Sequence, residues 1–197
     1  MEISETELRI ISSYSASELA GALIVGKAAR LTKDPELRAR LTLQCAEESR
    51  HAALWIETIL AVGGQPAEVH DTSRSHYYAR AGEFKSEIEL LAFIESFEKI
   101  VPFHLSKHLA RPGIHPKVQE TLLAIISDES GHLSWVSRKL DAMHKGESAH
   151  EVESARKKFS QITREVYENE VSRMRQAGGE LAEFAEILMK VFEQAFR

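Results

Sequence analysis

The sequence predicts an all-α protein: a four-helix bundle with one long crossover, plus two additional C-terminal helices. Apolar residues recur with the helical period of about 3.6 along most of the chain, and strand-like alternation is hard to find. Capping residues, glycines and prolines divide this pattern into six segments. Four long segments, paired by short loops and separated by one longer connection, are typical of such a bundle.

Local signals set the expected boundaries of the first two helices. Ser4 and Glu7 form a capping box, while Asp34 followed by Pro35 starts the second helix, which we expect to end at Gly63. The six predicted helices span about residues 4–31, 34–63, 86–111, 116–144, 148–178 and 179–197, with the crossover at residues 65–85.

Similar signals begin the later helices. Ser86 with Glu89 caps the third, Pro116 opens the fourth, and Ser148 with Glu151 caps the fifth. The charged runs of the fifth helix indicate a solvated face, and the apolar stripe of the sixth indicates packing on the bundle or on a second subunit.

The chain length and composition favour one domain and exclude several classes of partner. The 197 residues suffice for a single core over residues 1–197, with the bundle at 4–144 and a C-terminal helical extension at 148–197. The 30 acidic residues outnumber the 25 basic ones without a basic cluster, so we expect no nucleic-acid partner. We also expect no membrane partner, because no apolar run approaches the roughly 20 residues of a membrane span. Cys45 is the only cysteine, which fits a cytoplasmic protein.

Two Glu-x-x-His pairs lie near the centres of predicted helices. Glu48 and His51 belong to the second helix, and Glu129 and His132 belong to the fourth. Residues three apart share one helix face, so each pair can bind the same cation. The apolar neighbours of both pairs indicate that this face points inward.

A third copy of the motif serves as an internal control. Glu147 and His150 have the same spacing but lie in the polar start of the fifth helix, beside Gly146. Glu is common on exposed helix faces, so an isolated pair is a weak signal. We expect this copy to be solvated and functionally silent.

The helices that precede the two inward-facing pairs each carry a central glutamate. Glu18 precedes Glu48 by 30 residues and Glu98 precedes Glu129 by 31, so the chain reads as two copies of one unit. Glu95 lies one turn before Glu98 on the same side and stays open as an alternative or additional ligand.

Four carboxylates and two imidazoles at one level of a bundle form the ligand set of a dinuclear metal site. Carboxylates balance the charge of two divalent ions, and the remaining open positions admit dioxygen or peroxide. We expect two iron ions, with manganese as the second choice, because structural zinc sites favour thiolate. The expected catalytic and metal-binding residues are Glu18, Glu48, His51, Glu98, Glu129 and His132, with Glu95 as a further metal ligand.

This arrangement resembles the ferritin-like di-iron carboxylate superfamily, which includes rubrerythrin, bacterioferritin and di-iron oxygenases, over about residues 4–144. The resemblance implies two terminal carboxylates, two bridging carboxylates and one histidine for each metal. By this resemblance, the terminal carboxylates are those of Glu18 and Glu98, and the bridging carboxylates are those of Glu48 and Glu129. The two histidines are His51 and His132. Members of the superfamily differ in their ligands on the third helix, which leaves Glu95 and Glu98 both open.

Other residues near the proposed ligands suggest more local features. Pro102 cannot donate a hydrogen bond to the carbonyl of Glu98, so we expect a kink or bulge there. Tyr14, one turn before Glu18, is either a buried core residue or a redox-active tyrosine. His104 and His108 lie near a helix end, where we expect them to be at the surface.

The sequence leaves three functions open. The first is an oxidoreductase that activates dioxygen or peroxide and acts on a small hydrophobic substrate. It would need a separate electron donor because the chain lacks the cysteines of a rubredoxin domain. The second is ferroxidase activity and iron storage, as in bacterioferritin, and the third is a non-catalytic helical dimer. The two extra C-terminal helices favour the first function, and we expect a homodimer.

Overall fold

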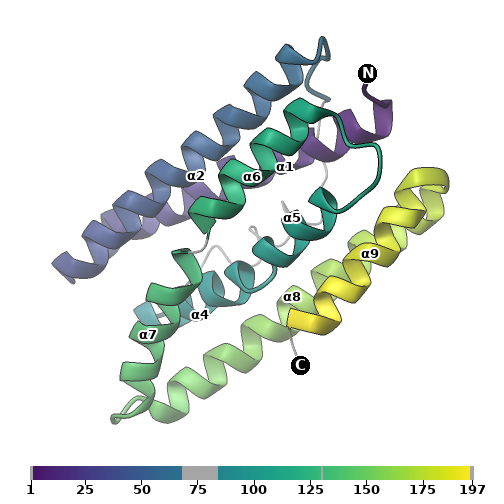
Figure 1. Cartoon of the computed structure of the whole chain (residues 1–197). Helices are drawn as coiled ribbons and strands as arrows, with labels where there is room; N and C mark the ends of the chain where they lie inside the picture. Colours follow the sequence, from purple (N-terminus) through teal and green to yellow (C-terminus); the bar gives the residue numbers. More distant parts are fainter. Residues whose placement is uncertain (1, 68–83, 130, 196–197) are drawn as a thin grey trace. The chain divides into compact units, whose positions relative to one another are not determined.

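The computed structural model describes residues 2–67, 84–129 and 131–195, which form only helices and their connections (Figure 1). The predicted crossover at residues 65–85 lies mainly outside these ranges. The helices are α1 (Glu5–Leu31), α2 (Pro35–Ala61), α4 (Glu87–Glu98), α5 (Val101–Leu109), α6 (Pro116–Glu129), α7 (His132–His144), α8 (Ala149–Ala177) and α9 (Gly179–Ala195).

The predicted starts of α1 and α2 are confirmed. The Ser4 side chain accepts a hydrogen bond from the backbone N–H of Glu7 at 3.1 Å. The Asp34 carboxylate accepts from the N–H groups of Glu36 and Leu37 at 2.9 and 3.2 Å. Both caps satisfy backbone donors that the first helical turn leaves without an internal acceptor.

The third predicted helix is interrupted at Pro102, as expected. α4 ends at Glu98 and α5 begins at Val101. The N–H of Lys99 donates to the carbonyl of Glu95 at 3.1 Å, so the helical backbone hydrogen bonds continue up to this point. Pro102 then lacks the N–H that would continue the ladder to Glu98. The interruption therefore falls directly after a predicted metal ligand.

A single uninterrupted helix over residues 116–144 was a wrong prediction. α6 ends at Glu129 and α7 begins at His132, and the N–H of Gly131 donates to the carbonyl of Asp128 at 3.3 Å in a tight turn. Glycine costs about 1 kcal/mol relative to alanine inside a helix, which weakens the ladder at Gly131. The second Glu-x-x-His pair therefore spans a helix interruption.

The predicted cap of the fifth helix was wrong in its contacts, although α8 begins where expected. Ser148 makes no capping hydrogen bond with its side chain. The Glu151 carboxylate instead accepts from the hydroxyl of Ser86 at 2.8 Å, and Ser86 also accepts from the N–H of Glu89. These contacts connect the start of α8 to the start of α4.

The chain divides into two compact units. The first contains residues 1–78 and 112–125, and the second contains residues 79–111 and 126–197, so α6 supplies residues to both. In the first unit, α1 and α2 pack along each other (Figure 1). In the second, α4 packs against α7 and α8, and α9 packs against α8 and α5. One domain over the whole chain stays a prediction.

Each unit has its own apolar core. In the first, Trp55 is fully buried and its ring centroid lies 5.2 Å from that of Tyr14. In the second, the rings of Phe93 and Phe159 meet edge to face at 5.9 Å. Buried aromatic pairs in such orientations contribute to packing beyond the area that they bury.

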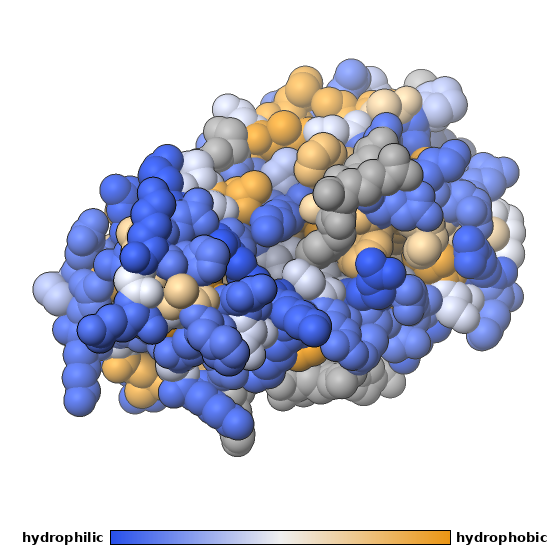
Figure 2. Space-filling model, turned by 90° about the horizontal axis from the view of Figure 1, so that it is seen from below, coloured by the Kyte–Doolittle hydropathy of each residue, from blue (hydrophilic) through white to orange (hydrophobic). Residues whose placement is uncertain are grey.

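The surface is mainly polar, with some exposed apolar side chains. Figure 2 shows one face, on which hydrophilic residues predominate and apolar residues form separate groups. Leu19 and Leu23 of α1 are among the exposed large apolar residues. By length and composition, α1 would be apolar enough to cross a membrane, but half of the residues in that stretch are buried inside the protein. The buried core helices of proteins also meet these criteria, so they are only weak evidence that α1 spans a membrane.

The turn after α2 provides a test of local backbone strain. Gly63 has a φ of +75°, a conformation that costs a residue with a side chain about 1 kcal/mol or more. We therefore expect Gly63→Ala to lower the free energy of unfolding by about 1 kcal/mol in urea denaturation. Gly146→Ala is the matched control, because Gly146 also lies in a turn but has no positive φ. Equal losses in both variants would contradict this account of the turn.

Candidate metal centre

Three predicted ligands meet between α1 and α2 in the first unit. Glu18 comes from α1, and Glu48 and His51 come from α2, with all three side chains buried. One ligand atom from each residue lies within 4.8 Å of those of the other two. We call these residues the N-terminal triad.

The surroundings of the N-terminal triad are buried and partly aromatic. Gln44, one turn before Glu48, donates its Nε2–H to Glu48 Oε1 at 3.3 Å. Tyr14 lies one turn before Glu18, and Trp55 lies one turn after His51. Burial of the carboxylates away from water is costly unless positive charge or hydrogen-bond donors compensate.

The other three predicted ligands meet in the second unit. Glu98 ends α4, Glu129 ends α6 and His132 begins α7, and all three are buried. His132 Nδ1 lies 3.0 Å from Glu129 Oε2 and 3.8 Å from Glu98 Oε2. We call these residues the C-terminal triad. Their ligand atoms also lie within 4.8 Å of one another.

The electrostatics of the C-terminal triad favour a positive charge at its centre. Burial by itself would lower the pKa of the His132 imidazole. The nearby carboxylates of Glu129 and Glu98 outweigh burial and raise that pKa to about 12. An imidazolium proton therefore compensates the two carboxylates when no other cation does. A divalent metal would displace this proton, because histidine binds metals in its neutral form.

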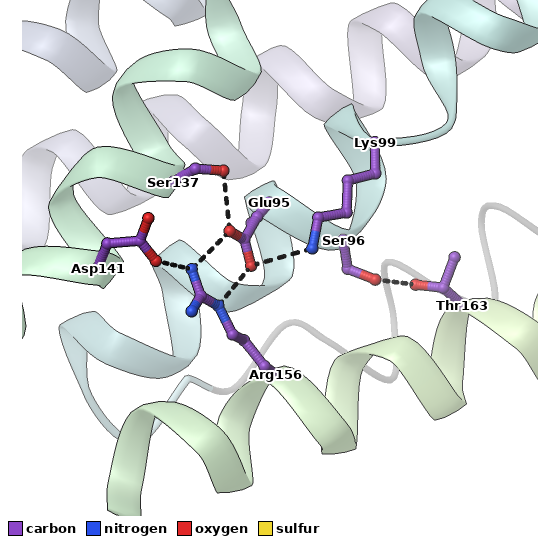
Figure 3. A network of polar contacts seen from close by, with 7 residues as sticks. All are labelled: Glu95, Ser96, Lys99, Ser137, Asp141, Arg156 and Thr163. Atoms are coloured by element: carbon purple, nitrogen blue, oxygen red, sulfur yellow. Dashed lines mark hydrogen bonds and ion pairs between the residues drawn. The ribbon is translucent and has the colours of Figure 1, made fainter. Parts of the chain in front are cut away.

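Glu95 lies in a network of polar contacts with Arg156, Ser137 and Lys99 (Figure 3). Arg156 of α8 binds it through two parallel hydrogen bonds, from Nε to Oε2 and from Nη2 to Oε1, both at 2.8 Å. The Ser137 hydroxyl donates to Glu95 Oε1 at 2.9 Å. Of the two glutamates that the sequence left open, the structure groups Glu98 with Glu129. Metal binding by any of these residues stays a prediction.

The Glu95 network holds a charged carboxylate in a buried position. Lys99 Nζ lies 3.5 Å from Glu95 Oε2, and Arg156 Nη2 also donates to Asp141 at 2.8 Å. Burial raises the pKa of Glu95, but Arg156, Lys99 and Ser137 together outweigh it, so the pKa is lowered. Glu95 thus has a permanent cationic partner within the protein.

The third Glu-x-x-His copy behaves as predicted. Glu147 and His150 are both exposed at the start of α8, whereas both members of the two inward-facing copies are buried. Burial thus separates the three copies, although their spacing is the same.

Two features differ from the sequence prediction. His104 and His108 are buried, contrary to expectation, and the ring of Phe184 on α9 lies 5.5 Å from each imidazole. The sequence did not identify Arg156 as a residue near the site, because it lies in a run of charged residues that predicts a solvated helix face. The only available signal was its place beside Ala155, within the apolar stripe of α8.

The residues of both triads fit a hard or borderline divalent cation. Each triad has two carboxylates and one imidazole, which suit iron or manganese, and neither includes a thiolate. The two triads also come from equivalent parts of the repeated helical unit. The chemistry of the donors therefore agrees with a dinuclear carboxylate site.

Two known proteins are similar to this chain. No protein-family model matches the chain. Over 120 residues it is 34% identical to a 3-demethoxyubiquinol 3-hydroxylase of Paracidovorax citrulli (strain AAC00-1), with 57% of this chain and 56% of that protein covered. The chain thus spans little more than half the length of this relative.

A solved structure matches almost the whole chain. It is described as protein 19 with aldehyde deformylating oxidase activity from Synechococcus, with a TM-score of 0.63 and 18% identity over 95% of this chain and 86% of that one. The predicted all-α fold is confirmed by this likeness over most of both chains. Both matched proteins are named for oxidative activities, the class predicted for this chain.

Acid sensitivity tests the Glu95 network in the metal-free protein. Because the folded pKa of Glu95 lies below 4.5, its stabilisation is present above pH 4.5 and is lost as the pH falls through the lowered pKa. We expect Arg156→Met to lower the free energy of unfolding at pH 7 by about 2 kcal/mol, since it leaves a buried carboxylate without its main partner. The deficit relative to the wild type should shrink as the pH falls below 4.

Urea denaturation with a chelator present, at pH 7 and at lower pH, measures this difference. Arg175→Met is the matched control. Arg175 lies on the same helix and pairs with Glu186 at 2.7 Å, but both side chains are more than half exposed. Exposed pairs contribute little, so its effect should be much smaller. A deficit for Arg156→Met that is the same at every pH would contradict the assigned role of the Glu95 charge.

Proposed function

We propose that this chain is a di-iron oxidoreductase that activates dioxygen or peroxide, and that both triads supply metal ligands. The observation that carries the proposal is the repetition of one buried donor set. Each triad combines a Glu from one helix with a Glu-x-x-His pair in the next part of the same repeated unit. Helical bundles that bind two metals with carboxylates use this donor set.

Charge balance supports two divalent ions. Four buried carboxylates carry four negative charges, and leaving such charges without partners in a protein interior costs several kcal/mol each. Two divalent cations would bring four positive charges and balance them fully. Iron is the first choice for a site of carboxylate and imidazole donors, and manganese is the second.

Some residues of the site would bind the metals, and others would orient the metal ligands. Bound iron would supply the redox chemistry needed to react with dioxygen or peroxide. Glu48 would keep its position through the hydrogen bond from Gln44, which occupies one of its oxygens. His132 would have to release the proton from Nδ1 before it binds a metal. Iron loading should therefore release protons.

The names of the matched proteins support an organic substrate. One denotes a hydroxylase of a quinol and the other an aldehyde oxidase, so each acts on an organic molecule by its name. We propose a small hydrophobic substrate and a separate electron donor for this chain. The homodimer, the cytoplasmic location and the absence of nucleic-acid and membrane partners stay proposals based on composition.

Iron content tests the proposed centre. We expect wild-type protein loaded with ferrous iron without oxygen, and then desalted, to retain about two irons per chain. A Glu48→Ala, Glu129→Ala double variant should lose most of this iron, because each substitution removes a carboxylate from one triad. Elemental analysis measures the result.

The third motif copy provides the matched control for iron content. A Glu147→Ala, His150→Ala variant removes the same residue types from exposed positions and should retain the wild-type iron content. Wild-type protein without iron would overturn the proposal. The same would follow if the control variant lost as much iron as the double variant.

Oxygen consumption separates catalysis from storage. Iron-loaded wild-type protein, supplied with a reductant, should consume dioxygen or peroxide catalytically, and the double variant should not. Native mass spectrometry should show a small oligomer. A large particle holding many irons per chain would instead identify an iron-storage protein.

A further inference from the structure

A group of polar side chains connects three helices beside the C-terminal triad (Figure 3). Arg156 extends from α8 and binds Glu95 on α4 through two hydrogen bonds and Asp141 on α7 through a third, all at 2.8 Å. Ser137 of α7 also donates to Glu95 at 2.9 Å. We call Arg156, Glu95, Ser137 and Asp141 the guanidinium clamp.

The clamp lies where the helical backbone gives least support to the proposed ligands. Glu98 is the last residue of α4 and His132 is the first residue of α7. At helix ends, the regular backbone ladder no longer fixes the residue on both sides. Glu95 precedes Glu98 by one turn, and Ser137 follows His132 by about a turn and a half. Contacts between the helices must therefore set the distance between the two ligands.

We propose that Arg156 is a positioning residue of the metal centre. By binding α4 and α7 at once, it fixes the helix ends that carry Glu98 and His132 at the separation needed for metal binding. This inference rests on the proposed metal centre and adds a residue from the C-terminal extension to it.

The geometry explains why an arginine occupies this position. Its planar guanidinium offers several N–H donors in a fixed arrangement that matches a carboxylate with two parallel hydrogen bonds. Nη2 of Arg156 serves Glu95 and Asp141 at the same time. A lysine has a single compact charge on a flexible stem, so it would keep the attraction and lose the fixed geometry.

The clamp also occupies both carboxylate oxygens of Glu95, which disfavours Glu95 as a metal ligand. Its two oxygens accept hydrogen bonds from Arg156 and Ser137, and Lys99 lies 3.5 Å from Oε2. The Glu95 side chain is only 3% exposed. Buried ion pairs of this kind often add little net stability, so a geometric role accounts for them better than a purely stabilising one.

Cobalt(II) binding tests this role without relying on activity. The visible absorption of bound cobalt(II) depends on its coordination geometry, so it reports the positions of the ligands. We expect Arg156→Met to weaken cobalt(II) binding roughly tenfold or more, within the range seen when partners of metal ligands are removed, and to change the absorption spectrum. Arg156→Lys should recover part of the affinity. Arg175→Met, on the same helix, should bind and absorb like the wild type.

The outcomes separate this inference from the proposed function. If wild-type protein binds no cobalt(II) or iron, the proposed centre fails and the positioning role falls with it. If the wild type binds cobalt(II) and Arg156→Met binds it with unchanged affinity and spectrum, only the positioning role is overturned. A lower unfolding temperature with unchanged cobalt(II) binding is a purely structural effect and would also overturn it.

A second variant covers the case in which Arg156→Met does not fold. Ser137→Ala removes one hydrogen bond to Glu95 and leaves both hydrogen bonds from Arg156 in place. We expect a smaller loss of cobalt(II) affinity with a spectral change in the same direction. A Ser137→Ala variant and an Arg156→Lys variant that both match the wild type would overturn the inference.

Discussion

The rest of the structure depends on how buried carboxylates obtain positive charge. In the second unit, two carboxylates one helical turn apart on α4 obtain positive charge in different ways. Glu95 has a permanent cation, the guanidinium of Arg156, within hydrogen-bonding distance. Glu98 and Glu129 lie beside an exchangeable one, the proton on His132, whose pKa they raise to about 12. A carboxylate whose cation is covalently part of the chain cannot release it to a metal, whereas a proton can be displaced. The protein thus separates structural carboxylates from those suited to metal binding.

The two triads have the same donors but different backbone support. Glu18, Glu48 and His51 lie inside α1 and α2, each of which is an uninterrupted helix of 27 residues. Glu98 and His132 lie at helix ends, beside interruptions associated with Pro102 and Gly131. In the first unit the helical backbone itself therefore holds the proposed ligands in register. In the second, contacts among α4, α7 and α8 must do so, and this is where the long C-terminal helix α8 enters the site.

Local sequence signals predicted the features that depend on local physics. The caps at Ser4 and Asp34 and the interruption at Pro102 follow from single residues and their neighbours. Local signals could not show which partners Glu95 and Glu98 have, because both lie on the inner side of one helix. The main partner of Glu95 is Arg156, 61 residues later, and the sequence places Arg156 in a run predicted to be solvated. The burial of His104 and His108 likewise depends on where α9 packs.

The three Glu-x-x-His copies show why context assigns function better than a motif does. The spacing is identical in all three, so each has the same intrinsic ability to bring a carboxylate and an imidazole together. At Glu147 and His150, water solvates both groups and no cation is required. In the two buried copies, removal from water makes the carboxylates costly without positive charge, and a third residue from another helix completes each triad. We therefore infer that affinity for a metal would come from burial and a converging third donor, and both depend on the packing of the helices.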